Sequence, residues 1–205
     1  MKKTAILLYD FFSNYELSVA LSVLMQGGKP YEVFCLTDEV VSEEGLHVRR
    51  SKALEDLIYD DYDSLLLPGC MDLRELIENE RILNFLQVFQ PSRYVIAAIS
   101  SAPLLLLKAG LLIDKQYIAG IIKSELMEEG FTEDDLKGLR DINELKNPDG
   151  TYLTCLVDRQ LITAVGCAFV EFGITFGKQL GLDFSTKWYE TKDIIFCVMP
   201  DNTRK

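Results

Sequence analysis

The sequence is poor in histidine: a single one, His47, is present among 205 residues. A His-rich metal site is therefore excluded, and any Ser-His or Cys-His mechanism would depend on this residue. His47 follows Leu46 and precedes Val48 in an alternating stretch over 40–50, which favours a structural role on a small hairpin. The five cysteines are scattered without zinc-ligand spacing, and their odd number is typical of a reducing compartment. We expect neither a metal nor a cofactor.

Basic residues and long apolar runs are also scarce. The chain has 21 Lys and Arg against 32 Asp and Glu, a net charge of −11. Phosphate binding needs clustered positive charge, so nucleic acid is an improbable partner. No apolar run reaches membrane-spanning length, and the start of the chain lacks a signal-peptide cleavage site. We expect a cytoplasmic protein without a membrane partner.

No repeat, linker or low-complexity segment is present, so we expect a single domain over residues 1–205. Apolar runs that suit buried strands alternate with segments of helical periodicity. This pattern predicts an α/β fold of three layers, with a mostly parallel central sheet covered by helices on both faces. Expected strands cover 4–9, 31–36, 63–67, 94–99 and 117–122, with a hairpin over 151–157 and 161–165. Expected helices cover 15–25, 72–78, 80–89, 166–180 and 185–195, and another begins at Pro103.

The segment 94–110, YVIAAISSAPLLLLKAG, reads as a strand, an abrupt turn and a helix, with Ser100 at the corner. Proline is tolerated in the first helical turn, and glycine stops the helix at Gly110. Small residues must flank such a corner, and Ala98 and Ala102 meet that need. The pattern follows the nucleophile elbow, with alanines where its commonest form has glycines. Ordinary strand–helix packing is the alternative interpretation.

Two further segments have candidate site residues at the carboxyl ends of expected strands, where parallel sheets place ligands. Glu16 lies in the first turn of the helix over 15–25. It is either a carboxylate facing the helix dipole or a functional acid. Gly69 and Cys70 follow the strand over 63–67. Backbone amides at such a turn can bind an oxyanion, and Cys70 is a candidate reactive thiol.

Four segments, TAILLYDFFSNYELSVALSVL, YDSLLLPGC, YVIAAISSAPLLLLKAG and DRQLITAVGCAFVEFGITFGKQLG, together resemble the ThiJ/PfpI family in order and spacing. This family belongs to the class I glutamine amidotransferase-like superfamily. The resemblance covers about residues 3–182 and leaves 183–205 as a C-terminal helix and tail. It implies a flavodoxin-like, class I glutamine amidotransferase-like fold and a homodimer.

The resemblance also implies roles for individual residues. Ser100 stands where the family has its elbow cysteine, and Glu16 matches the glutamic acid that is hydrogen-bonded to that cysteine. Gly69 and Cys70 match a turn whose amides face the cleft, and the Ser101 amide is the other expected oxyanion donor. The chain departs from the family in the serine itself and in the apolar residues, near Ile121, where many members have a histidine. A further signature is replaced by Val165-Gly166-Cys167-Ala168.

These assignments predict a hydrolase of the amidase or peptidase type that acts on a small molecule or a peptide. Ser100 would be the nucleophile, and it needs a general base, for which Glu16 is the candidate. The alternative is a non-catalytic small-molecule-binding or stress-related member that has lost the cysteine chemistry. A transcription-factor sensor domain ranks last, because no helix-turn-helix follows Leu182 and the net charge is acidic.

Overall fold

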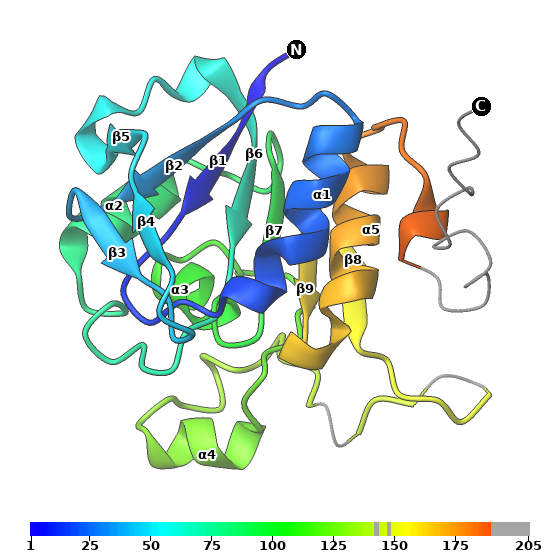
Figure 1. The fold of residues 1–205 in the computed structure, drawn as a ribbon. Helices are drawn as coiled ribbons and strands as arrows, with labels where there is room; N and C mark the ends of the chain where they lie inside the picture. The colour runs from blue at the N-terminus through cyan, green and yellow to red at the C-terminus, as the bar shows by residue number, and fades with distance from the viewer. Residues whose placement is uncertain (142–143, 147–148, 190–205) are drawn as a thin grey trace, which may run out of the picture.

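The computed structural model describes residues 1–141, 144–146 and 149–189. Its centre is a seven-stranded sheet with the strand order β5-β2-β1-β6-β7-β9-β8. Every neighbouring pair in this sheet is parallel except the β8–β9 hairpin at one edge. The predicted α/β fold with a mostly parallel sheet is therefore confirmed (Figure 1).

Apart from the two-residue edge strand β5, which was not predicted, the strands of the large sheet coincide with apolar runs of the sequence, because strands covered on both faces need apolar side chains in succession. The strands of the large sheet are β1 (Lys3–Leu7), β2 (Tyr31–Cys35), β5 (Lys52–Ala53), β6 (Tyr62–Leu67), β7 (Val95–Ile99), β8 (Cys155–Asp158) and β9 (Leu161–Ala164). A separate antiparallel hairpin consists of β3 (Glu39–Val41) and β4 (His47–Arg49). His47 lies on this hairpin, exposed, with Nδ1 at 2.8 Å from Glu39 Oε1.

Helices cover both faces of the sheet (Figure 1). On one face, α1 (Ser18–Gln26) and α5 (Phe169–Gln179) lie side by side, and each follows a short 3₁₀ turn, η1 (Asn14–Leu17) or η4 (Gly166–Ala168). Gly173 permits this close packing, since a methyl group there would lie 2.6 Å from the Ala20 nitrogen. The other face carries α2 (Glu80–Gln87) and α3 (Pro103–Lys108). The remaining elements are α4 (Lys123–Glu128) and three 3₁₀ turns, η2 (Leu54–Asp56), η3 (Tyr59–Asp61) and η5 (Thr186–Trp188).

Three expected elements differ from the structure. Residues 72–78 form turns rather than a helix, and the expected strand over 117–122 is reduced to an isolated bridge between Tyr117 and Leu139. The hairpin β8–β9 occupies the sheet edge beside β7, so 117–122 has no strand position left, and the Ile118 amide donates instead to Thr163 Oγ1 at 2.9 Å. Of the expected helix over 185–195, η5 is present, and residues 190–195 lie outside the described part.

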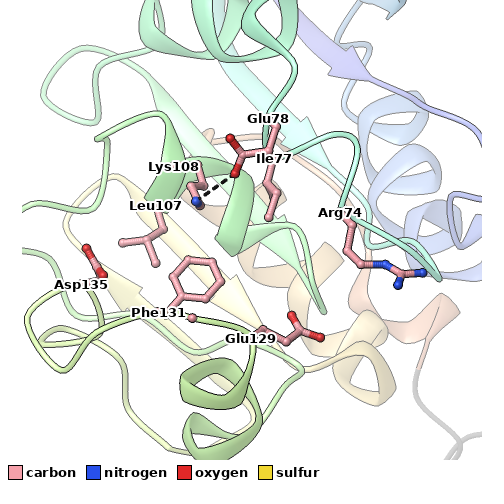
Figure 2. Close-up of a pocket in the computed structure, with 9 residues that line it drawn as sticks. Arg74, Ile77, Glu78, Leu107, Lys108, Glu129, Phe131 and Asp135 are labelled. Atoms are coloured by element: carbon pink, nitrogen blue, oxygen red, sulfur yellow. Dashed lines mark hydrogen bonds and ion pairs between the residues drawn. The ribbon is translucent and has the colours of Figure 1, made fainter.

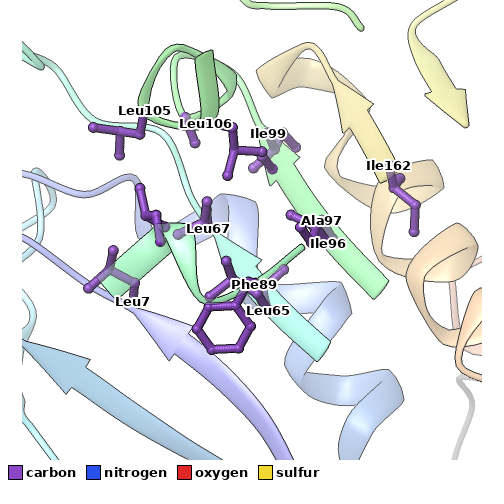
Figure 3. Packing of buried hydrophobic residues seen from close by; sticks show 14 of the residues in the cluster. Leu7, Leu65, Leu67, Phe89, Ile96, Ala97, Ile99, Leu105, Leu106 and Ile162 are labelled. Atoms are coloured by element: carbon purple, nitrogen blue, oxygen red, sulfur yellow. The ribbon is translucent and has the colours of Figure 1, made fainter. Parts of the chain in front are cut away.

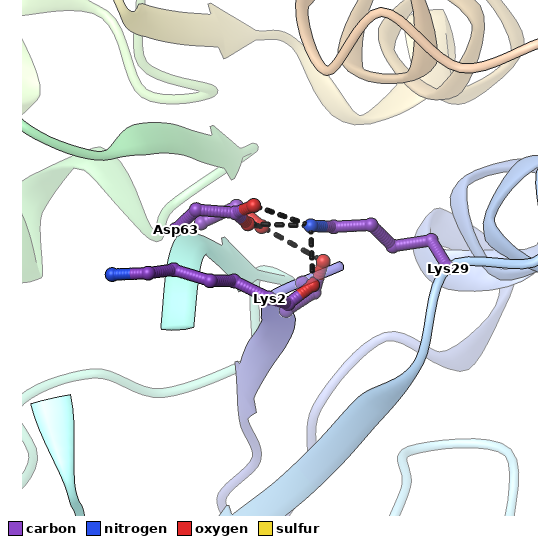
Figure 4. Close-up of polar contacts among 5 residues, drawn as sticks. Lys2, Lys29 and Asp63 are labelled. Atoms are coloured by element: carbon purple, nitrogen blue, oxygen red, sulfur yellow. Dashed lines mark hydrogen bonds and ion pairs between the residues drawn. The ribbon is translucent and has the colours of Figure 1, made fainter. Parts of the chain in front are cut away.

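Buried aliphatic and aromatic side chains fill the space between the sheet and its helices. Figure 3 shows Leu65 and Leu67 of β6 beside Ile96 and Ile99 of β7. One buried charge lies at the amino ends of the strands: Lys29 Nζ donates to both Asp63 carboxylate oxygens, at 2.5 and 2.7 Å, and to the Lys2 carbonyl (Figure 4). The Lys29 side chain is only 2% exposed, so this cation depends on its oxygen partners. The core thus anchors the strands whose carboxyl ends form the candidate site.

Candidate functional site

Ser100 forms the corner between β7 and α3 in a strained backbone conformation. Its φ of +61° lies in the left-handed region, which costs a residue with a Cβ about 1–2 kcal/mol. Two short backbone hydrogen bonds fix the corner: the Ser100 amide donates to the Ala164 carbonyl at 2.7 Å, and the Gly120 amide donates to the Ser100 carbonyl at 2.6 Å. The backbone of the corner is therefore held from both sides.

Three glycines surround the Ser100 side chain. A methyl group at Gly69 would lie 2.9 Å from Ser100 Oγ, and one at Gly120 would lie 3.1 Å from the same atom. A methyl group at Gly166 would lie 2.7 Å from Glu16 Oε1 and 3.4 Å from Ser100 Oγ. The space beside the hydroxyl exists because these positions have no side chain. Gly120 and Gly166 are not among the residues predicted for the site, because the sequence pattern places them in an expected strand and at an expected helix start.

The Glu16 carboxyl lies beside the Ser100 hydroxyl, in the 3₁₀ turn η1 that follows β1. The residue is completely buried, with 0% of its surface exposed. Burial raises the pKa of Glu16, while hydrogen bonds from the Gly69 amide, the Ser100 side chain and Tyr15 act in the opposite direction. The Gly69 amide donates to Oε2 at 2.6 Å, and the Tyr15 hydroxyl donates to Oε1 at 3.3 Å. A carboxylate with a raised pKa is a stronger base than an exposed one.

The turn at 68–71 is attached to the segment that leads into η1. The buried Tyr9 hydroxyl donates to the Pro68 carbonyl, and the Ser13 amide donates to the Gly69 carbonyl at 2.9 Å. An antiparallel bridge also joins Phe12 to Cys70. These contacts hold the Gly69 amide against the Glu16 carboxyl, so the carboxyl ends of β1 and β6 together place the acid.

The three amides expected to bind an oxyanion are in different situations. The Gly69 amide already donates to Glu16, and the Cys70 amide donates to Ser101 Oγ at 3.0 Å. The Ser101 hydroxyl in turn donates to the Cys70 carbonyl at 3.1 Å. Within the part of the chain that the structure describes, the Ser101 amide donates to no acceptor, which leaves it available to a ligand.

Cys70 does not have the environment of a reactive thiol. Burial raises its pKa to about 12, and its Sγ donates to the Asp72 carbonyl at 3.3 Å. The thiol is therefore protonated at neutral pH. Cys35, Cys70, Cys155 and Cys167 are all free, and Cys197 lies outside the described residues. Among the residues described, no cluster of three or more His, Cys, Asp or Glu side chains could hold a metal ion.

A groove made of two adjoining cavities begins at Ser101, the residue after the corner, and neither cavity is lined by Ser100 or Glu16. A cavity of about 250 Å³ reaches Cys70 and Ser101 and is otherwise lined mainly by apolar side chains, among them Leu104 and Ile121. It shares Arg74, Ile77, Glu129 and Phe131 with a second cavity of about 570 Å³. Figure 2 shows the Phe131 ring in this second cavity, with the ion pair of Lys108 and Glu78, 3.1 Å long, at its edge. The two cavities together are large enough for an elongated ligand.

The structure therefore brings Ser100, Glu16 and Gly69 into one cluster, with Cys70 and Ser101 linked to each other at its side. None of the described helices is long and apolar enough to span a bilayer.

Known proteins resemble this chain in sequence and in fold. The protein named "Putative cysteine protease YraA" from Bacillus subtilis (strain 168) is 29% identical over 135 residues, which are 63% of this chain and 78% of the relative. A DJ-1 superfamily protein, Atu0886 from Agrobacterium tumefaciens, has a TM-score of 0.74 at 23% identity, with 96% of this chain and 98% of that chain covered.

A two-domain protein with DJ-1/ThiJ/PfpI-like and ferritin-like domains from Anabaena variabilis has a TM-score of 0.71 at 21% identity. Here 89% of this chain is covered, and the chain spans about half (49%) of that protein. At these identities the solved structures support the fold alone. The sequence profile of the DJ-1/PfpI family matches residues 2–179, most of the chain. The chain belongs to the DJ-1/PfpI family.

Proposed function

We propose that this protein is a hydrolase of the amidase or peptidase type, with Ser100 as the nucleophile and Glu16 as its acid and base. One observation carries the proposal: a hydroxyl on a strained strand–helix corner lies beside a buried carboxyl whose pKa is raised. Strain and a perturbed pKa at the same point are typical of functional sites. A relative named as a cysteine protease supports the same class of reaction, with a serine as the nucleophile here.

The proposed reaction uses only groups of this chain and water. Ser100 Oγ attacks the substrate carbonyl carbon, and its proton moves to the Glu16 carboxylate. The carbonyl electron pair moves to oxygen, which accepts a hydrogen bond from the free Ser101 amide. When the tetrahedral intermediate collapses, the leaving group takes the proton from Glu16 and departs. Water then attacks the acyl-enzyme by the same route, which releases the acid and restores the Ser100 hydroxyl.

The groove supports an elongated substrate rather than a compact metabolite. The cavity beside Ser101 shares four lining residues with the cavity around Phe131, so a substrate with its carbonyl at Ser100 would extend past Ser101 over apolar side chains. A peptide with an apolar side chain next to the scissile bond has the required length and chemistry.

A binding protein without turnover is the second candidate function. The observation that favours it is that both oxygens of the Glu16 carboxyl are already engaged, Oε2 by the Gly69 amide and Oε1 by the Tyr15 hydroxyl. The single histidine, His47, pairs with Glu39 on the β3–β4 hairpin and does not act on Glu16. In this case the groove would hold a ligand beside an unreactive Ser100.

Labelling with a fluorophosphonate separates the two candidates, because the probe forms a bond with an activated serine and not with an ordinary hydroxyl. We expect one adduct per chain, located at Ser100 by peptide mapping. The variant Ser100→Ala should give no adduct, whereas a matched serine variant, Ser92→Ala in the exposed turn before β7, should keep it. A wild-type protein that is not labelled, yet binds peptides in the groove, would contradict the hydrolase and favour the binding protein.

A further inference from the structure

We infer that Tyr15 is a positioning residue of this site: its hydroxyl holds Oε1 of Glu16, so that the carboxyl has a fixed orientation toward Ser100. The role of Tyr15 in catalysis rests on the proposed function, whereas its role in orienting the Glu16 carboxyl rests on the contacts of Tyr15 alone. Each oxygen of the carboxyl has its own donor, the Tyr15 hydroxyl at 3.3 Å for Oε1 and the Gly69 amide at 2.6 Å for Oε2. Rotation of the carboxyl would break both hydrogen bonds.

The neighbourhood of Gly166 shows that the Tyr15 hydroxyl reaches the cluster, although 43% of the residue is exposed. A methyl group at Gly166 would lie 2.7 Å from Glu16 Oε1, 3.0 Å from the Tyr15 hydroxyl and 3.4 Å from Ser100 Oγ. Three oxygens from two elements therefore converge on one small space above the backbone at the start of η4. Any proton that leaves Ser100 for Oε1 moves in a space that Tyr15 borders.

The Tyr15 ring is itself held in place. It meets the ring of Phe169, the first residue of α5, edge to face, with centroids 5.6 Å apart and an angle of 89° between the planes. The backbone of Tyr15 is fixed as well, because its amide donates to Glu44 Oε1 at 3.3 Å. Burial, followed by the Glu16 charge, raises the pKa of Tyr15 to about 12, so the hydroxyl stays protonated and remains a donor at neutral pH.

Within the described part of the chain, no Lys, Arg or His side chain forms an ion pair with Glu16. Glu43, from the loop between β3 and β4, raises the pKa of Glu16. Tyr9 at the end of β1 and Cys70 on the 68–71 turn lie within the electrostatic reach of Glu16, and Cys167 of η4 acts on Tyr15. All four are acids, so hydrogen-bond donors alone stabilise the Glu16 carboxylate. Removal of one donor must therefore shift its ionisation to higher pH.

The variant Tyr15→Phe tests the inference, because it keeps the ring against Phe169 and removes only the hydroxyl. The first readout is independent of activity: the ionisation of the Glu16 carboxyl, followed by ¹³C NMR and assigned with Glu16→Gln. We expect the midpoint to move to higher pH by about 0.5–1 unit, since a hydrogen bond to a charged group is lost. The control Phe169→Leu removes the ring contact, keeps the hydroxyl and should shift the midpoint less. An unchanged midpoint in Tyr15→Phe would overturn the inference.

The second readout is the rate of fluorophosphonate labelling as a function of pH. In Tyr15→Phe the rising part of this profile should move to higher pH by the same interval as the NMR midpoint. The labelling rate should fall several-fold at pH values below the midpoint and change little on the plateau. A residue that only supports the fold would lower the rate at every pH without moving the profile. If the wild type is not labelled, the proposed hydrolase fails, while the NMR midpoint still decides whether Tyr15 positions Glu16.

Discussion

Replacement of Ser100 by glycine should stabilise the protein relative to replacement by alanine. Both substitutions remove the hydroxyl and its contact with Glu16, so they differ only in the backbone. At φ +61° alanine keeps a strain of about 1–2 kcal/mol, which glycine does not have. Glycine costs about 0.4–1 kcal/mol more conformational entropy on folding. At the central values of these two terms, the free energy of unfolding of Ser100→Gly is about 0.5–1 kcal/mol higher than that of Ser100→Ala.

Calorimetry and urea denaturation measure this difference. A free-energy change of 1 kcal/mol corresponds to a shift in Tm of about 2–4 °C for a chain of this size, so Ser100→Gly should melt about 1–4 °C above Ser100→Ala. The neighbouring position is the control, because Ser101 does not have a positive φ. There the order should reverse, with Ser101→Ala more stable than Ser101→Gly. If Ser100→Gly is no more stable than Ser100→Ala, the corner is not strained and the argument from strain to function is wrong.

Three further predictions concern buried charges and thiols. The raised pKa of Glu16 means that the folded state holds this proton more tightly than the unfolded chain, so the contribution of Glu16 to stability is fully present below the ordinary pKa of glutamate and is lost as pH rises through the raised value. Tm measured from pH 4 to 8 should therefore show Glu16→Gln gaining on the wild type with increasing pH, and a constant difference would refute this. Iodoacetamide at pH 8 should modify the exposed Cys167 well before Cys70, whose pKa is about 12. Mass spectrometry of the digested protein can follow both thiols, and equal rates of modification would mean that the 68–71 turn opens. Lys29→Met should lower the free energy of unfolding by about 1–3 kcal/mol, because the Asp63 carboxylate and the Lys2 carbonyl lose a charged donor. Urea denaturation measures this change, and an unaltered unfolding midpoint would contradict the structural role of the ion pair.

The corner and the acid could be predicted from the sequence because both depend on local signals. An apolar strand, two small flanking alanines and Pro103 define the turn at Ser100, and a residue in the first turn after β1 must lie near the carboxyl ends of neighbouring strands. The turn at Gly69 was predictable for the same reason. The α/β architecture followed from the alternation of apolar runs with helical periodicity.

The details that complete the site depend on contacts between distant segments. Gly120 and Gly166 come close to Ser100 only because the chain returns there twice, and no local pattern distinguishes them from other glycines. The occupation of the Gly69 amide by Glu16 joins residues 53 positions apart. The segment over 117–122 is as apolar as a strand, but the β8–β9 hairpin takes the sheet edge beside β7. Competition for one edge is a property of the whole fold and cannot be read from a single segment.

Two features that disfavour folding are found side by side in this chain, and a purely structural explanation does not account for both. The left-handed conformation of Ser100 stores backbone strain. Ionisation of the Glu16 carboxyl is costly, because the residue is fully buried and no cation is among the groups that act most strongly on it. Each could be relieved by one substitution, Ser100→Gly or Glu16→Gln, without loss of the surrounding packing. Elsewhere the core strands follow ordinary local preferences, with apolar runs in the strands and Pro103 at the start of α3. Phe11, Asp114 and Arg159 also have a positive φ, but among the residues described only at Ser100 does the strained residue lie beside a fully buried carboxyl. That combination is what selection for chemistry produces, because an activated hydroxyl needs a fixed direction and a base that holds a proton.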